Sequence, residues 1–205
     1  SRIDYSNDTA TAVAKGPLTA TRKYLAATGN TSYGYFAGGT NPGGNLSLID
    51  RVDYSSDTPT ASSKGPLTST RESLSGASSR ANALPTTSGQ QTRSVTVTVG
   101  TPYGYFGGGY SGSAIVSIVD RVDYSSDTDA AVAKGPLSVA RYALAATGNT
   151  SYGYFGGGQD PGFFSTVDRV DYSNDTGTTP TKGPLSVARR RLAATGNASY
   201  GYFGG

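Results

Sequence analysis

The sequence predicts an all-β fold built from four tandem repeats, because three short motifs recur in fixed order and at nearly fixed distances. "DYS" is followed by "KGPL" after 12 residues, and "KGPL" by "YGYF" after 17 residues in three of the units. A standard unit is 49 residues long, and units begin near residues 4, 53, 123 and 171. Periods of this length that hold several short apolar segments are typical of propeller blades. We therefore expect one β-propeller domain over residues 1–205.

The first two strands of a unit are expected to form a hairpin. "RYALAAT" (141–147) and "SYGYFGG" (151–157) are short apolar segments joined through "GN", a dipeptide suited to a tight connection. "SVARYALAAT" is also rich in Ala and Leu, so a short helix there remains an alternative.

The third and fourth strands follow from alternation and turn signals. "STVDRVDYS" (165–173) alternates between apolar and charged residues, which predicts a strand with an apolar face and a charged face. "SNDT" or "SSDT" then supplies turn residues, and "DAAVAKGPL" (129–137) can return as a fourth strand. Each unit is thus expected to be a blade of four antiparallel strands.

The ends of the chain suggest how such a ring would close. The sequence starts within a third strand and stops after a second strand, so pairing of the N- and C-terminal strands would complete a fourth blade. A larger propeller or an array is the alternative. The absence of Met, even at position 1, indicates a processed form or a part of a longer polypeptide.

Composition excludes several classes of site. The chain has no Cys and no His, which excludes thiolate and imidazole ligands and histidine acid–base chemistry. The net charge is +3, but the basic residues are spread over the repeats, so we expect no nucleic-acid partner. No apolar stretch is long enough for a membrane span, and we expect no cofactor.

In this register the unit resembles the kelch repeat of β-propellers. The matching segments are "PLSVAR", the aromatic strand with its glycines in "YGYFGGG", and the strand that closes on "VDYSND". The resemblance implies structural roles for a double glycine and for a tyrosine at the strand end, although the Trp of the family is missing. The implied positions are Gly38, Gly39, Gly107, Gly108, Gly156, Gly157, Gly204 and Gly205, with Tyr5, Tyr54, Tyr124 and Tyr172.

The amino-acid sequence of the repeats is also similar to that of repeat proteins of tailed bacteriophages of aquatic cyanobacteria. "GYFGGG", "STVDRVDYSNDT" and "KGPLSVAR" carry this second resemblance. It implies a tail fibre or another virion-associated setting, and a virion, extracellular or cell-surface location.

Two sets of repeated charged residues are candidate sites. Arg22, Arg71, Arg141 and Arg189 recur at one position and are expected to pair with a neighbouring blade or a repeated Asp, with a ring of ligand-binding guanidinium groups as the alternative. The Asp of "DYS" and the Asp four residues later are expected to serve strands and turns, with a calcium site as the alternative.

The second unit departs from the others between residues 72 and 102, where it carries 21 extra residues. Loops on rigid scaffolds often carry function, so this insertion is the leading candidate for a partner contact. "SVTVTVG" (94–100) alternates strictly and can form an added strand, or the loop can be a tolerated expansion without a partner. The candidate contact residues are Glu72, Arg80, Asn82, Gln90, Gln91 and Arg93.

The sequence therefore favours a non-enzymatic binding or structural module that presents loops to a glycan or protein receptor. A scaffold that associates with itself is the first alternative. A glycan-processing enzyme with paired carboxylates is the second, but Glu72 is the only Glu, and the Asp residues recur in every unit whereas a catalytic pair normally occurs once.

Overall fold

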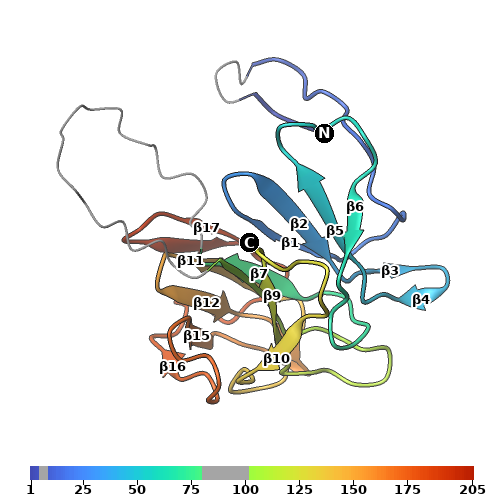
Figure 1. Cartoon of the computed structure of the whole chain (residues 1–205). Helices are drawn as coiled ribbons and strands as arrows, with labels where there is room; N and C mark the ends of the chain where they lie inside the picture. The colour runs from blue at the N-terminus through green and yellow to red at the C-terminus, as the bar shows by residue number, and fades with distance from the viewer. Residues whose placement is uncertain (5–8, 80–101) are drawn as a thin grey trace.

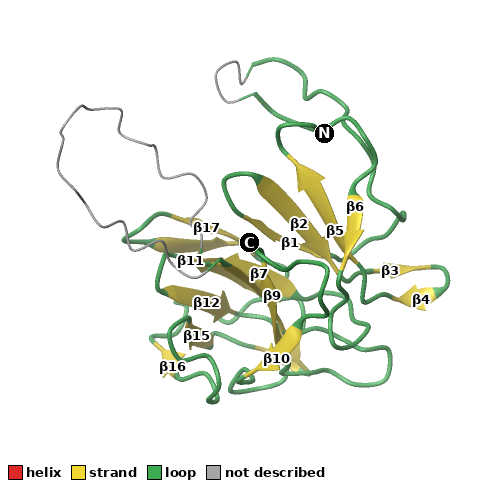
Figure 2. Ribbon diagram, viewed as in Figure 1, coloured by secondary structure: helices red, strands yellow, loops and turns green. Residues whose placement is uncertain are grey.

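The chain folds entirely into strands, turns and loops in a computed structural model that describes residues 1–4, 9–79 and 102–205. These described residues contain eighteen strands and no helix (Figure 2). The expected all-β fold is confirmed. The helical alternative for 138–147 is wrong, because residues 138–144 form bends and one isolated bridge before the strand starts at Ala145.

Twelve of the strands form three four-stranded antiparallel sheets, one for each complete unit (Figure 1). Within each sheet the strands lie in chain order, and each second strand pairs with both the first and the third. The sheets consist of β1 (Ala26–Gly29), β2 (Tyr33–Ala37), β5 (Ile49–Asp53) and β6 (Ser62–Lys64); β7 (Ser75–Ser78), β8 (Tyr103–Gly107), β9 (Val119–Asp123) and β10 (Val132–Lys134); and β11 (Ala145–Gly148), β12 (Tyr152–Gly156), β15 (Val167–Asp171) and β16 (Thr181–Lys182).

Three small hairpins complete the described strands. Two of them lie between the second and third strands of a unit, and the third follows the last sheet. They are β3 (Thr40–Asn41) with β4 (Gly44–Asn45), β13 (Gln159–Asp160) with β14 (Gly162–Phe163), and β17 (Ala193–Gly196) with β18 (Gly201–Gly204).

The turn of each regular hairpin is fixed by the Asn of "GN". The side-chain oxygen of Asn149 accepts hydrogen bonds from the backbone N–H groups of Ser151 and Tyr152, both at 2.9 Å. An Asn side chain that satisfies two backbone donors stabilises a tight turn locally. The same contacts recur at Asn30 and Asn197, so the predicted hairpin is confirmed in these units.

The third strand differs from the expectation of one apolar and one charged face. Asp168 is fully buried and lies on the same face as Val170, while Arg169 lies on the face of Val167. Both faces of the second and third sheets are covered at this strand, so alternation of polarity does not report exposure there. The fourth strand is present as predicted but spans only two or three residues in each sheet.

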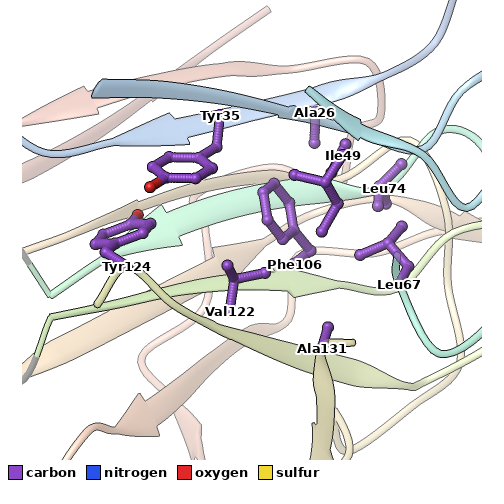
Figure 3. Close-up of a cluster of buried hydrophobic side chains, with 10 residues drawn as sticks. Ala26, Tyr35, Ile49, Leu67, Leu74, Phe106, Val122, Tyr124 and Ala131 are labelled. Atoms are coloured by element: carbon purple, nitrogen blue, oxygen red, sulfur yellow. The ribbon is translucent and has the colours of Figure 1, made fainter. Parts of the chain in front are cut away.

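The core lies between successive sheets. One cluster joins the first sheet to the second and includes Tyr35, Ile49, Phe106 and Tyr124 (Figure 3). An equivalent cluster joins the second sheet to the third. The first strands of the units lie beside one another in the order β1, β7, β11 and β17. The sheets are therefore packed face to face in series, each covering its neighbour.

A buried carboxylate joins the polar groups at each of these junctions. The carboxylate of Asp127 accepts hydrogen bonds from the Tyr35 hydroxyl and the Arg51 guanidinium, both at 2.7 Å, and lies 3.2 Å from the Lys64 ammonium. Burial alone would raise the pKa of Asp127, but the hydrogen bonds from Tyr35, Lys64 and Arg51 outweigh it, and this pKa is lowered. Burial, together with the hydrogen bond to this carboxylate, raises the pKa of Tyr35.

Asp175 repeats this arrangement at the next junction. It accepts from Tyr105 at 3.0 Å and Arg121 at 2.9 Å, with Lys134 at 3.3 Å. Asp127 and Asp175 therefore each connect one sheet to the preceding one.

The described residues near the two ends of the chain form no strand pair with each other. The hairpin β17–β18 packs beside β11, and in the described residues β18 pairs with β17 alone. At the other end, Arg2 forms an isolated bridge with Val13, at positions that correspond to Arg51 and Ser62 in the first sheet. The expected pairing of N- and C-terminal strands is not formed by the described residues.

Candidate functional site: a variable face across the repeats

A buried ion pair anchors the segment that precedes the first strand of each complete unit. Arg71 lies 2.8 Å from Asp120 and Arg141 lies 2.9 Å from Asp168, and these four side chains are fully buried. Arg22 and Asp50 form the same pair at 3.1 Å. The expected pairing of the repeated Arg with a repeated Asp is thus observed, but within its own sheet and with the Asp of "DRVD" rather than that of "DYS".

Further hydrogen bonds fix this anchor to the sheet. Arg141 donates to the backbone oxygens of Phe155 and Gly157, at 3.0 and 2.9 Å. Asp168 accepts from the backbone N–H and the hydroxyl of Ser138, at 3.0 and 2.7 Å. Burial lowers the pKa of Arg71, but its carboxylate partner favours the charged form. The residues directly after each Arg therefore emerge at a defined place.

Those residues differ in all four repeats. The two positions between the anchoring Arg and the following Leu read Lys23–Tyr24, Glu72–Ser73, Tyr142–Ala143 and Arg190–Arg191. Residues after the glycines of the second strand also differ, as Thr40–Asn41, Tyr110–Ser111 and Gln159–Asp160. Sequence reasoning missed these positions, although a comparison of the four repeats with one another would have found them.

The structure brings the two variable segments of each unit together. Backbone bridges join Lys23 to Thr40, Glu72 to Tyr110, and Tyr142 to Gln159. Successive units are also linked here, since the N–H of Ser73 donates to the oxygen of Tyr24 at 2.8 Å and the N–H of Ala143 to that of Ser73 at 2.9 Å. We call the residues of these segments the variable face. They are Lys23, Tyr24, Thr40, Asn41, Glu72, Ser73, Tyr110, Ser111, Tyr142, Ala143, Gln159, Asp160, Arg190 and Arg191.

Aromatic and charged side chains contact one another across the variable face. The rings of Tyr110 and Tyr142 lie 6.5 Å apart between their centroids, and Arg190 lies 5.0 Å above the ring of Phe163. Gln159 donates to the hydroxyl of Tyr142 and accepts from Arg190. Tyr24 and Phe163 remain exposed. Amphipathic aromatic residues and Arg are the side chains that contribute most to binding interfaces.

A pocket of about 580 Å³ opens at the junction of the first and second units. Its walls include Lys23, Tyr24, Asn41 and Glu72. One carboxylate oxygen of Glu72 is buried and has no hydrogen-bond partner among the described residues. The pocket thus combines an aromatic ring with a cation, an amide and a carboxylate, which suits a polar ligand with apolar faces.

Glycines at the end of the second strand link each unit to the next. Gly38, Gly108 and Gly157 have positive φ angles of 65°, 69° and 69°, and a Cβ at each would lie 2.6 to 2.7 Å from the backbone oxygen of the next anchoring Arg. Only glycine fits such a close approach. The residues equivalent to Gly38 and Gly39 are Gly108 and Gly109, so Gly107 and Gly156 belong to the strands and correspond to Ala37.

The strand-end tyrosines and the Asp of "DYS" make different contacts: the tyrosines pack between sheets, and the Asp residues bond within a turn. Tyr124 and Tyr172 stack on Tyr35 and Tyr105 of the preceding sheet, at 4.7 and 4.9 Å between ring centroids. Asp53, Asp123 and Asp171 accept hydrogen bonds from the Ser two residues later. In the described part of the chain, no group of three or more acidic side chains is placed to hold a metal ion.

Several predicted residues lie outside the described ones. These are Tyr5, the strand expected at 94–100, and Arg80, Asn82, Gln90, Gln91 and Arg93 of the insertion. Glu72, the first residue of the region that contains the insertion, lies on the variable face instead. Arg189 donates to the backbone oxygen of Gly205 at 3.3 Å.

Comparison with known proteins adds no relative, since no family model and no curated protein matches the chain. Within the described ranges no helix is both long and apolar enough to cross a membrane.

Proposed function

We propose that this chain is a non-enzymatic binding module of the kelch-like β-propeller type. Three four-stranded antiparallel sheets, packed in series with their first strands side by side, support this architecture. In propellers of this kind, a rigid set of sheets presents loops to a ligand. The repeated anchors keep the sheets alike, while the variable face gives each unit a different surface.

The observation that carries the binding function is the variable face. A ligand-binding surface needs different side chains at equivalent positions, because a single partner does not have the symmetry of the repeats. The first three strands, the hairpin turns and the repeated Arg of this chain recur closely, whereas the two residues after each of these Arg do not.

The chemistry of the face fits a glycan or protein receptor. At the pocket, the exposed ring of Tyr24 can cover the apolar face of a sugar, while Lys23, Asn41 and Glu72 can bond its hydroxyl groups. The resemblance of the repeat sequence to phage repeat proteins supports a location on a virion or cell surface. A receptor on a host or cell surface is consistent with that location.

Glycan-array retention with a Tyr24→Ala variant tests this function. Tyr24 and Ala143 hold equivalent positions with φ of 57° and 56°, so alanine is compatible with this backbone. We expect the variant to keep its fold by circular dichroism and to lose glycan retention by about tenfold, as for loss of one aromatic anchor.

Val132→Ser is the matched control, because Val132 is exposed on β10 and the equivalent residue in the first sheet is Ser62. It should bind as the parent does. Absence of retention on glycans and on host-surface proteins by the parent chain, or equal losses in both variants, would contradict the proposal.

A further inference from the structure

Glu72 lines the pocket at the junction of the first and second units, and its carboxylate differs from the other buried ones. Five buried Asp side chains each form an ion pair with one or two basic side chains, and these are Asp50, Asp120, Asp127, Asp168 and Asp175. The Oε2 atom of Glu72 is also buried, but among the described residues it has no hydrogen-bond partner. Buried polar atoms are almost always bonded, so this oxygen lacks a donor that a ligand can supply.

The backbone holds Glu72 at a fixed position on the variable face. It directly follows Arg71, whose guanidinium lies 2.8 Å from Asp120. The N–H of Glu72 donates to the oxygen of Tyr110 at 3.0 Å, and the N–H of Tyr110 donates to the oxygen of Glu72 at 2.9 Å. Glu72 is the only Glu of the chain, and the equivalent residues of the other units are Lys23, Tyr142 and Arg190. The first pocket wall to meet a ligand here is therefore acidic, unlike the equivalent positions of the other units.

The aromatic wall of the pocket is formed by Tyr24 in a strained conformation. Its φ is 57°, in the left-handed region that favours glycine, and glycine does occupy the positive-φ positions Gly38 and Gly39 of the same unit. The side chain of Tyr24 is 55% exposed, so it contributes little to the core. Strained residues cluster where binding requires a particular side-chain position. The strain at Tyr24 thus supports a role of its ring in binding rather than in folding.

The remaining wall is polar and leaves Glu72 without a cation. The ammonium of Lys23 lies 5.1 Å from the centroid of the Tyr24 ring, and in the part of the chain that the structure describes it forms no ion pair with Glu72. The side-chain oxygen of Asn41 accepts from the N–H of Gly43 at 2.8 Å, so the amide nitrogen of Asn41 is the group that can donate to a ligand. A sugar ring with several hydroxyl groups matches these donors, whereas a Lys side chain of a protein partner offers only its ammonium.

We propose that this pocket binds a sugar that carries a free amino group. The ammonium of the sugar donates to the carboxylate of Glu72, while the apolar face of the sugar ring lies on Tyr24. A neutral hydroxyl group can also donate, but only a cation balances the buried charge, and a charge-assisted hydrogen bond is about twice as strong as a neutral one. The proposal rests on the glycan binding proposed above and adds the class of sugar.

Three β-1,4-linked tetrasaccharides test the proposal, because they share one backbone and differ only at C2 of each ring. The glucosamine tetramer has ammonium groups there, the N-acetylglucosamine tetramer acetamide groups, and the glucose tetramer hydroxyl groups. Isothermal titration calorimetry at about pH 6, where an amino group is protonated, measures each Kd. We expect the full chain to bind the glucosamine tetramer about tenfold more tightly than the other two, as for one hydrogen bond between charged groups.

Glu72→Gln keeps the shape of the side chain and removes its charge. We expect this variant to bind all three tetrasaccharides with affinities within about twofold of one another, at the level that the parent shows for the uncharged ones. Asp129→Asn is the matched control, because it changes the net charge by the same amount at an exposed position outside the pocket walls, where the other units have Pro59 and Gly177. It should keep the tenfold preference of the parent.

The outcomes separate this proposal from glycan binding itself. Equal affinities of the parent for the three tetrasaccharides, or a preference that persists in Glu72→Gln, would overturn the amino-sugar proposal and leave glycan binding in place. Tetralysine bound as tightly as the glucosamine tetramer, and released by Glu72→Gln, would assign the cation to a protein partner and would also overturn it. A parent chain that retains no glycan of any kind would overturn both proposals.

Discussion

Arg141 and Asp168 show how much of this fold depends on single buried charges. Their side chains are fully buried and lie 2.9 Å apart; Arg141 also donates to the backbone of β12 at Phe155, and Asp168 of β15 accepts from the backbone of Ser138 in the loop. A buried ion pair adds little stability compared with apolar residues of similar volume. Loss of one partner, however, leaves the other charge buried and uncompensated. The pair therefore fixes the loop that begins the variable face, and truncation of one partner is costly.

We expect Arg141→Ala to lower the free energy of unfolding by about 3–5 kcal/mol, because Asp168 then remains buried without its cation. Lys134→Ala is the control, since Asp175 keeps Arg121 and Tyr105 as partners, and the loss there should be about 1 kcal/mol or less. Urea unfolding measures both. Small and equal losses of the free energy of unfolding in Arg141→Ala and Lys134→Ala would show that the buried pair does not anchor the loop.

The link between sheets depends on the short segment after each second strand. The backbone N–H of Gly109 donates to the oxygen of Arg141 at 3.0 Å, which joins the second unit to the third. Gly108 makes this approach possible through its positive φ and its lack of a Cβ. The glycines of "YGYFGGG" thus act as a connection between successive units.

At this scale we expect Gly108→Ala to destabilise the protein by about 3 kcal/mol, from the strained φ and from the contact with the oxygen of Arg141. Gly44→Ala serves as a comparison, because Gly44 also has positive φ but nothing lies within 4 Å of an added Cβ. Gly44→Ala should lower the free energy of unfolding by about 1–2 kcal/mol. Thermal unfolding distinguishes the two, and a Gly44→Ala loss as large as that of Gly108→Ala would contradict the role of the close contact.

The whole molecule is a series of sheets joined by the same carboxylate and tyrosine contacts, so its stability should depend on pH at both extremes. The pKa of Asp127 is lowered, so its contribution is present above the unfolded value near 3.8 and is lost as pH falls through the lower folded value. Burial raises the pKa of Tyr124 to about 12, and an acid with a raised pKa loses its contribution as pH rises above the ordinary value of 10.0.

We therefore expect a stability plateau between about pH 5 and pH 9, with losses on both sides. On the alkaline side, Tyr124 alone should account for about 2–3 kcal/mol by pH 12. Unfolding followed by circular dichroism against pH, with phenolate absorbance as a second signal, measures this. A Tyr124→Phe variant should lose part of the alkaline dependence, and an unchanged profile in that variant would contradict the assignment.

The sequence by itself determined the repeat, the approximate place of the four main strands of a unit and the hairpin turns, but not the small hairpins β3–β4 and β13–β14. These features are local, since turn residues such as Asn149 and the short apolar segments set the backbone without help from distant parts of the chain. It also indicated that the repeated Arg is structural, because a guanidinium that recurs once per unit matches a carboxylate that recurs at the same interval.

Only the tertiary structure decided which carboxylates are buried and which residues share a surface. Asp168 looks like a solvent-facing residue in an alternating strand, yet it is fully buried, because sheets packed in series cover both faces. The variable residues after the anchoring Arg and after the glycines are apart in sequence, and backbone bridges bring them together. Contacts between sheets depend on position in space, which the spacing of motifs along the chain does not encode.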